Sequence, residues 1–351
     1  MRKIAIAAGF LAATVVVAIA APRLVAKFGD ALARALHADP SFVIGGIAFE
    51  LASFAGYIAL FWHVAGRRTP RVGLRASAEI SLAGTAATRL LPTAGAGGAA
   101  LTFWSLRRAG QDNHSATRTL LSFLVVLYSV FLGSIFVAGT LLATGAVSSD
   151  VPVELSAIPA AFAGTAMALA LLLAVRHRTD ETPSGRVGVA AHAVGGAVRE
   201  ALVLVRRPDG RLAGALAWWG FDMLVLWATF SAFGAPPAAG VLVLGYFLGQ
   251  VANTVPLPGA ASGGMVGAFL ALGTPAEVVL PAVLAYRAIA IWTPVPAGAA
   301  ALAGLRRRVR AWAAEDGLEV EAGDEADVIA LPTRMPSPAP AAAHDAVPLA
   351  A

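Results

Sequence analysis

The sequence has no cysteine and little charge of either sign. Only 13% of its 351 residues are charged, against 58% that are hydrophobic, whereas soluble domains carry about 25% charged residues. The absence of cysteine excludes disulfides, thiolate metal sites and cysteine nucleophiles. The shortage of charge, the long apolar runs and a mean hydropathy of +0.73 predict an all-α polytopic integral membrane protein.

Recognisable enzyme motifs are also absent. The sequence contains no nucleophile elbow, Walker A loop or H-E-x-x-H motif, and its six histidines show no metal-ligand spacing. We therefore expect no enzymatic activity, no metal, no cofactor and no nucleic-acid partner. Residues 1–310 hold 25 basic against 13 acidic side chains. This excess suits contact with anionic lipid headgroups, or it reflects ordinary topology signalling.

Several apolar runs approach the roughly 20 residues that a helix needs to cross a bilayer. The predicted spans are 2–21, 42–65, 119–145, 157–175, 213–234 and 276–304. The first resembles a signal peptide, because Arg2 and Lys3 precede it and "AIA" resembles a cleavage site. Its length favours an uncleaved first helix.

Arginine is concentrated in alternate connections, which predicts that these connections are cytoplasmic. The basic connections are 66–78, 104–118, 176–212 and 305–310, whereas 146–156 and 235–240 contain no basic residue. We expect a cell (inner) membrane protein with its N-terminus and C-terminal tail in the cytoplasm.

Three stretches are expected to lie outside the membrane core. Helical periodicity places 184–212 along the inner surface and an amphipathic helix from 22–41 along the outer surface. Residues 311–351 are acidic and then rich in proline and alanine, and this composition predicts a disordered tail after a transmembrane domain of residues 1–310.

The apolar regions 79–106 and 241–273 contain matching interruptions. "RLLPTAGAGGA" at 89–99 aligns with "VPLPGAASGGM" at 255–265. The aligned pairs include Pro92 with Pro258, Gly97 with Gly263 and Gly98 with Gly264. Since the connections flanking each region must lie on one side, each region is predicted to be a re-entrant hairpin, one entering from the cytoplasm and the other from outside.

Such breaks indicate a binding site, because irregular backbone at membrane depth is tolerated only inside protein or beside a water-filled cavity. A helix that begins after a proline break presents free N–H groups and a positive dipole end, which favour an anion such as phosphate. Paired broken helices indicate a transporter's binding site. The alternative is that these glycines serve helix packing.

Four ionisable residues are expected at membrane depth, namely Glu50, Arg89, Asp222 and Arg287. One interpretation places both arginines near the hairpin tips as partners for a phosphate headgroup, with Glu50 and Asp222 as charge partners. The other interprets Arg89–Glu50 and Arg287–Asp222 as structural ion pairs, or the side chains as snorkelling. The residues expected at the site are Arg89, Pro92, Gly97, Gly98, Asn253, Pro258, Gly263, Gly264 and Arg287, with Gln250 adding hydrogen-bonding capacity. Tyr286 is interpreted as a packing aromatic.

Two segments carry a resemblance to a known family. These are "RLLPTAGAGGAALTFWSLRRAG" at 89–110 and "PLPGAASGGMVGAFLALGTPAEVVLPAVLAYRAIAIWTPVPAG" at 256–298. They resemble the flippase-like family typified by the transmembrane domain of lysylphosphatidylglycerol synthases, over roughly residues 1–308. The family often places an acidic residue after each glycine break, but here Ala99 and Met265 follow. A soluble aminoacyl-transferring domain is also missing after Arg310, so the resemblance implies lipid flipping without lysyl-lipid synthesis.

The resulting hypothesis is movement of a phospholipid or lipid-linked precursor between membrane leaflets. Its ligand would be a membrane lipid with a phosphate headgroup. The alternatives are a non-transporting membrane scaffold and a membrane-embedded lipid-modifying accessory protein of envelope synthesis.

Overall fold

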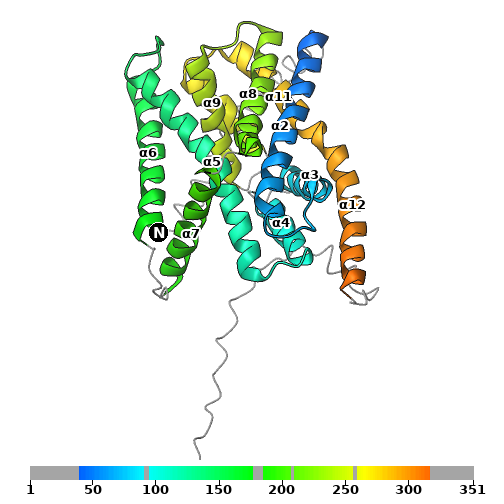
Figure 1. The fold of residues 1–351 in the computed structure, drawn as a ribbon. Coiled ribbons are helices and arrows are strands. Elements are labelled where there is room, and N and C mark those ends of the chain that lie inside the picture. The colour runs from blue at the N-terminus through cyan, green and yellow to red at the C-terminus, as the bar shows by residue number, and fades with distance from the viewer. Residues whose placement is uncertain (1–38, 91–94, 177–184, 207–208, 256–258, 317–351) are drawn as a thin grey trace, which may run out of the picture.

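The computed structural model describes residues 39–90, 95–176, 185–206, 209–255 and 259–316. Throughout these ranges the chain forms helices and connections without a strand, which confirms the all-α prediction (Figure 1). The helices are α2 (Pro40–Gly66), α3 (Leu74–Leu90), α4 (Ala96–Arg108), α5 (Asn113–Ala143), α6 (Val153–Arg176), α7 (Gly185–Arg206), α8 (Gly214–Phe233), α9 (Ala239–Val251), α10 (Ala260–Ala271), α11 (Ala276–Trp292) and α12 (Pro294–Glu315), with 3-10 turns η1 (Gly210–Ala213) and η2 (Ala252–Thr254). The predicted first helix, nearly all of the outer-surface helix and almost the whole tail lie outside the described residues.

Within the described ranges, six stretches of helix are long and apolar enough to cross a membrane by length and composition. Helices α2, α5, α6 and α8 agree closely with four predicted spans. The predicted span 276–304 lies within Ala276–Glu315, which is long and apolar enough to cross a membrane, but this stretch is interrupted at Thr293, between α11 and α12. Pro294 has no N–H to continue the hydrogen-bond ladder, and a proline ring crowds the preceding turn of a helix.

Helix α7 packs at one end of α6. Its Gly195 lies against the backbone of Leu173, and its Arg199 donates a hydrogen bond to the carbonyl oxygen of Ala174. Glu200 forms ion pairs with Arg68 and Arg118, which belong to two basic connections. Residues 187–206 are also long and apolar enough to span a membrane, so the predicted surface position of this helix stays a prediction.

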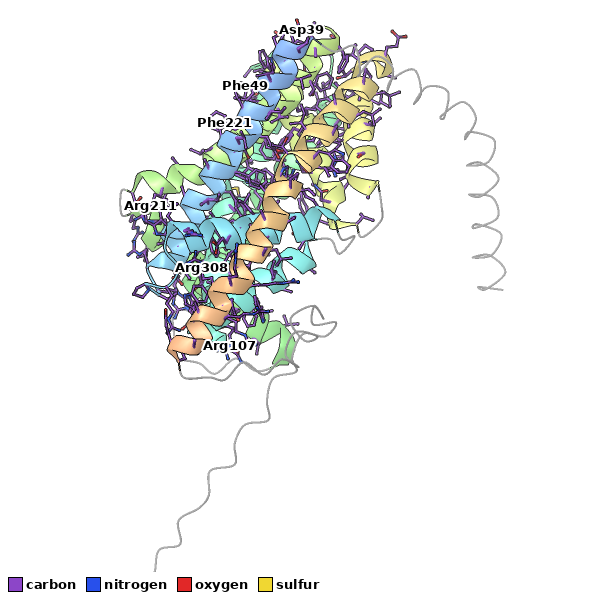
Figure 2. All side chains as sticks on the ribbon, turned by 90° about the vertical axis from the view of Figure 1, so that its right-hand side faces the viewer. Asp39, Phe49, Arg107, Arg211, Phe221 and Arg308 are labelled. Carbon is purple, nitrogen blue, oxygen red and sulfur yellow. The ribbon has the colours of Figure 1, made fainter. Side chains whose placement is uncertain are left out.

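The basic connections gather at one end of the molecule. Arg71 donates hydrogen bonds to Asp316 at 2.5 and 2.8 Å, and these bonds hold the pKa of the Asp316 carboxyl below its ordinary value. Arg107 and Arg308 lie toward this end, opposite Asp39 (Figure 2). The connections from α5 to α6 and from α8 to α9 lie at the other end (Figure 1). This separation agrees with the predicted alternation of loops, while the side that faces the cytoplasm stays a prediction.

Glycines allow α2 and α8 to pack closely. A Cβ atom on Gly56 would lie 2.6 Å from the Cβ of Ala217 and 2.9 Å from the carbonyl oxygen of Gly214. A Cβ atom on Gly214 would in turn collide with the backbone of Gly56 and lie 3.1 Å from the Leu60 nitrogen. Because backbone cannot move aside as a side chain can, only glycine fits at this crossing.

This crossing yields a stability prediction with a control on the same helix. Gly214→Ala is expected to lower the free energy of unfolding by about 1–3 kcal/mol, the usual cost of overpacking. Gly220 has open space around its Cα, so Gly220→Ala is expected to be neutral or stabilising by up to about 1 kcal/mol. Denaturant titration in mixed micelles measures both. Equal effects of the two substitutions would contradict the close crossing.

Candidate functional site

Two pairs of short helices occupy the regions predicted to be broken. In the first pair α3 is followed by α4, and in the second α9 is followed by α10; these helices have 17, 13, 13 and 12 residues. Gly95 (φ +85°) and Gly259 (φ +80°) precede α4 and α10 in the left-handed region, and neither helix start has a side-chain cap. The matched interruptions are therefore real breaks, and the first N–H groups of α4 and α10 have no carbonyl partner within their own helix. Pro92 and Pro258 lie outside the described residues, and re-entrant placement in a membrane stays a prediction.

The second glycine of each Gly-Gly pair packs within its own hairpin. A Cβ atom on Gly98 would collide with Thr88 and with the Gly84 carbonyl oxygen, and one on Gly264 would collide with Ala252. For Gly263, by contrast, none of the described residues has an atom within 4 Å of an added Cβ. Packing thus explains Gly98 and Gly264, whereas Gly263 remains free for a ligand role.

The two adjacent glycines of α10 make a matched pair of variants. Gly264→Ala is expected to destabilise the protein by about 1–3 kcal/mol, because the new methyl group meets Ala252. Gly263→Ala is expected to leave stability unchanged within about 0.5 kcal/mol. Thermal unfolding of both variants in detergent tests the assignment. A larger loss for Gly263→Ala than for Gly264→Ala would contradict it.

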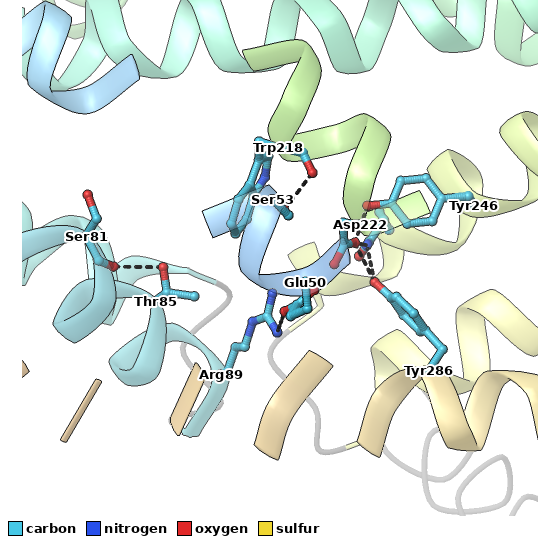
Figure 3. A network of polar contacts seen from close by, with 10 residues as sticks. Glu50, Ser53, Ser81, Thr85, Arg89, Trp218, Asp222, Tyr246 and Tyr286 are labelled. Carbon is cyan, nitrogen blue, oxygen red and sulfur yellow. Dashed lines mark hydrogen bonds and ion pairs between the residues drawn. The ribbon is translucent and has the colours of Figure 1, made fainter. Parts of the chain in front are cut away.

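A buried ion pair joins α2 to the end of α3. Nη1 of Arg89 donates to Oε1 of Glu50 at 2.9 Å (Figure 3). Glu50 is fully buried, and the Arg89 side chain is 17% exposed. The guanidinium also lies 5.5 Å from the ring centroid of Phe54, within cation–π range. The predicted Arg89–Glu50 ion pair is therefore present, and it brings the end of α3 against the middle of α2.

Asp222, in α8, is the acceptor at the centre of a second set of hydrogen bonds. The buried hydroxyl groups of Tyr246 and Tyr286 both donate to Oδ2 of Asp222, the latter at 2.6 Å (Figure 3). Gln250 donates to the Tyr286 hydroxyl at 3.1 Å and approaches Asp222 at 3.4 Å. Asn253 donates to Gln250, which links the predicted Asn253 to the cluster through one intermediate.

Arg287 follows Tyr286 on α11 and is partly buried. Its Nε is buried and has no hydrogen-bond partner among the described residues. The predicted ion pair between Arg287 and Asp222 does not occur among the ion pairs described for the structure, and the tyrosine hydroxyls bind Asp222 in its place. Within the part of the chain that the structure describes, the Nε of Arg287 is therefore a donor without an acceptor.

The cluster unites much of what the sequence indicated and adds two side chains. Glu50, Arg89 and Asp222 come together from α2, α3 and α8. Tyr246 was not anticipated, and Tyr286 is more than a packing aromatic, because its hydroxyl binds Asp222. The available signal was the spacing of Tyr246 and Gln250, which places both on one face of α9.

These features define a class: an all-α, multi-pass membrane protein whose two short-helix hairpins meet a buried polar cluster. Residues 4–298 match the model of the lysylphosphatidylglycerol synthase TM region. The chain belongs to this family, as the sequence resemblance indicated, and it is a membrane protein linked to lipid metabolism or transport. A search of curated proteins finds no match.

Proposed function

We propose that this protein moves a lipid with a phosphate headgroup, either a phospholipid or a lipid-linked precursor, between the leaflets of the cell membrane. The observation that supports this function best is the Glu50–Arg89–Asp222 cluster, in which Arg89 comes from the first hairpin and Asp222 accepts a hydrogen bond from Tyr246 of the second. Charged groups inside membrane proteins are costly and usually mark a substrate pathway. The proposal assigns the chain no chemical reaction and no nucleic-acid ligand.

In this mechanism the headgroup enters between the two hairpins. The positive dipole ends of α4 and α10, and the Nε of Arg287, which has no hydrogen-bond partner among the described residues, hold this headgroup. Arg89 joins them when it separates from Glu50. The phosphate headgroup then takes the place of Glu50 as the acidic partner of Arg89. Rocking of one hairpin against the other then opens the site to alternate leaflets.

The scaffold hypothesis has support of its own. Arg89 is already paired with Glu50, and Gly98 and Gly264 serve packing. A scaffold would need no exchange of partners at Arg89, and no unsatisfied guanidinium at Arg287. The two hypotheses therefore differ most clearly in the consequence of changing Arg287.

Lipid scrambling in reconstituted vesicles tests the proposed function. Arg287→Ala removes a charge-assisted hydrogen bond worth about 1.5–3 kcal/mol, so the transport rate of fluorescent phosphatidylglycerol is expected to fall on the order of 10–100-fold. Arg306→Ala is the matched control, because Arg306 is exposed near the basic end of α12. Absence of scrambling by the unmodified protein, or full activity of Arg287→Ala, would favour the scaffold. Mass spectrometry of copurifying lipids identifies the headgroup independently.

A further inference from the structure

Glu50 and Asp222 each keep one oxygen without a hydrogen-bond donor. Oε1 of Glu50 accepts from Arg89, and Oδ2 of Asp222 accepts from the two tyrosines. Oε2 of Glu50 and Oδ1 of Asp222 are buried and have no donor among the described residues. An unsatisfied carboxylate oxygen in such a position is costly, so a missing donor has to be identified.

The Glu50 and Asp222 side chains lie next to one another in the cluster, between Arg89 and the two tyrosines (Figure 3), and the two carboxyl groups interact with each other. An ionised carboxylate only accepts hydrogen bonds, so a bond between two carboxyl groups requires a proton on one of them. We infer that Glu50 and Asp222 share one proton at neutral pH and form a proton-binding site inside the helical bundle. This proton supplies the donor that both orphaned oxygens lack.

The charges around the pair support a single shared proton. The two carboxyl groups have one cation in ion-pair contact, Arg89 of α3. With both carboxyl groups ionised, the three side chains would carry one excess negative charge in a region of low dielectric. With one proton between the carboxyl groups, Arg89, Glu50 and Asp222 are neutral as a set.

The other neighbouring elements bring no second ion-paired cation. Tyr246 of α9 and Tyr286 of α11 donate hydrogen bonds, and Arg287 is next to Tyr286 without an ion pair to either carboxyl group among those described. Helix α5 meets α2 and α8 through the aromatic rings of Phe123 and Phe131. The remaining charged contacts between α2 and the start of α8 involve His63, Asp209 and Arg211, which interact with one another.

A proton site beside Arg89 also suggests how transport is coupled to charge, a consequence that rests on the proposed function. A phosphate headgroup that takes Arg89 from Glu50 adds one negative charge to the neutral set. Uptake of a second proton by the carboxyl pair restores neutrality. Binding of an anionic headgroup is then accompanied by proton uptake, and release of the headgroup by proton loss.

Infrared spectroscopy of the full chain in detergent micelles tests the shared proton directly. Exposed carboxyl groups are ionised at neutral pH, so the carbonyl-stretch band of a protonated carboxyl reports a buried one. The unmodified protein is expected to show this band at neutral pH, to shift it in heavy water and to lose it at high pH. Its absence at neutral pH would overturn the inference without any variant.

Two near-isosteric variants distinguish a shared proton from a proton on one residue. In Glu50→Gln, Asp222 keeps two tyrosine donors, and in Asp222→Asn, Glu50 keeps Arg89. Both remaining carboxyl groups are therefore expected to ionise, so the band disappears in each variant. Glu79→Gln is the matched control, because Glu79 pairs with Arg308 away from the cluster, and it should retain the band. Persistence of the band in either cluster variant would assign the proton to the remaining residue alone and overturn the shared site.

The coupling to lipid has a separate readout in the same sample. Adding short-chain ether-linked phosphatidylglycerol, which has no ester carbonyl to overlap the carboxyl band, to saturation is expected to increase the band about twofold, as a second proton is taken up. An unchanged band would overturn the coupling. If the unmodified protein still scrambles that lipid in vesicles, only the coupling fails; if it neither changes the band nor scrambles, the proposed function fails as well.

Discussion

Replacement of Glu50 by alanine is expected to lower the free energy of unfolding by about 3–5 kcal/mol. The substitution leaves the mostly buried guanidinium of Arg89 without its ion-pair partner, and an uncompensated buried charge is among the costliest single changes. Asp222 also interacts electrostatically with Arg89. It can take over part of the partnership, so the loss is expected near the lower end of this range.

Two controls distinguish the effect of losing a buried ion pair from the effect of losing any ion pair. Glu79→Ala removes the acidic partner of Arg308 in a pair that is partly exposed, and is expected to cost about 0–1 kcal/mol. The double variant Glu50→Leu/Arg89→Leu replaces both charges by apolar groups and is expected to recover most of the stability while losing transport. Denaturant titration in mixed micelles measures all three variants. A similar loss at Glu50 and Glu79 would contradict the buried character of the Glu50–Arg89 pair.

Replacement of Asp222 by leucine is expected to cost about 2–6 kcal/mol. Asp222 is the acceptor for two hydroxyl groups, those of Tyr246 and Tyr286, which are almost completely buried. Each buried donor left without an acceptor costs about 1–3 kcal/mol. Asp222→Asn keeps an acceptor oxygen at the same place and is expected to lose less than half as much stability.

The effect of Tyr286→Phe on stability is expected to depend on whether Asp222 is present. With Asp222 present, loss of the Tyr286 hydroxyl removes a hydrogen bond worth about 0.5–1.5 kcal/mol. In the Asp222→Leu protein the same substitution removes an unsatisfied hydroxyl, so it is expected to be neutral or stabilising. Additive effects of the two substitutions would show that the hydroxyl is satisfied elsewhere.

The features that sequence reasoning predicted well are those set by local chemistry. Apolar length alone located four helices, namely α2, α5, α6 and α8. Most of their ends lie within a few residues of the predicted ones. The aligned glycine breaks identified both hairpins, because left-handed turns and close helix crossings select glycine. The division of 276–304 could have been inferred as well, since Pro294 and Pro296 interrupt the donor series of a helix.

The sequence did not predict in the same way which residues of the site contact one another. Glu50 and Arg89 are 39 residues apart, and Asp222 and Tyr286 are 64 residues apart. Sequence placed both arginines, Glu50 and Asp222 at membrane depth, but which acid meets which base depends on how α2, α3, α8 and α11 pack. Tyr246 was missed because a tyrosine in an apolar helix looks like a core residue until its hydroxyl partner is known.

The division at Thr293 has a consequence for how the molecule can bend. On one side, Tyr286 of α11 binds Asp222. On the other, Gly298 of α12 lies against Leu82 and Ala86 of α3, and Arg308 holds Glu79 of the same helix. Helix α12 therefore packs against α3 of the first hairpin, whereas α11 is hydrogen-bonded to Asp222 of α8. A swing between these two bodies would therefore bend the chain between α11 and α12, where Pro294 lacks the N–H that would continue the helix hydrogen bonds.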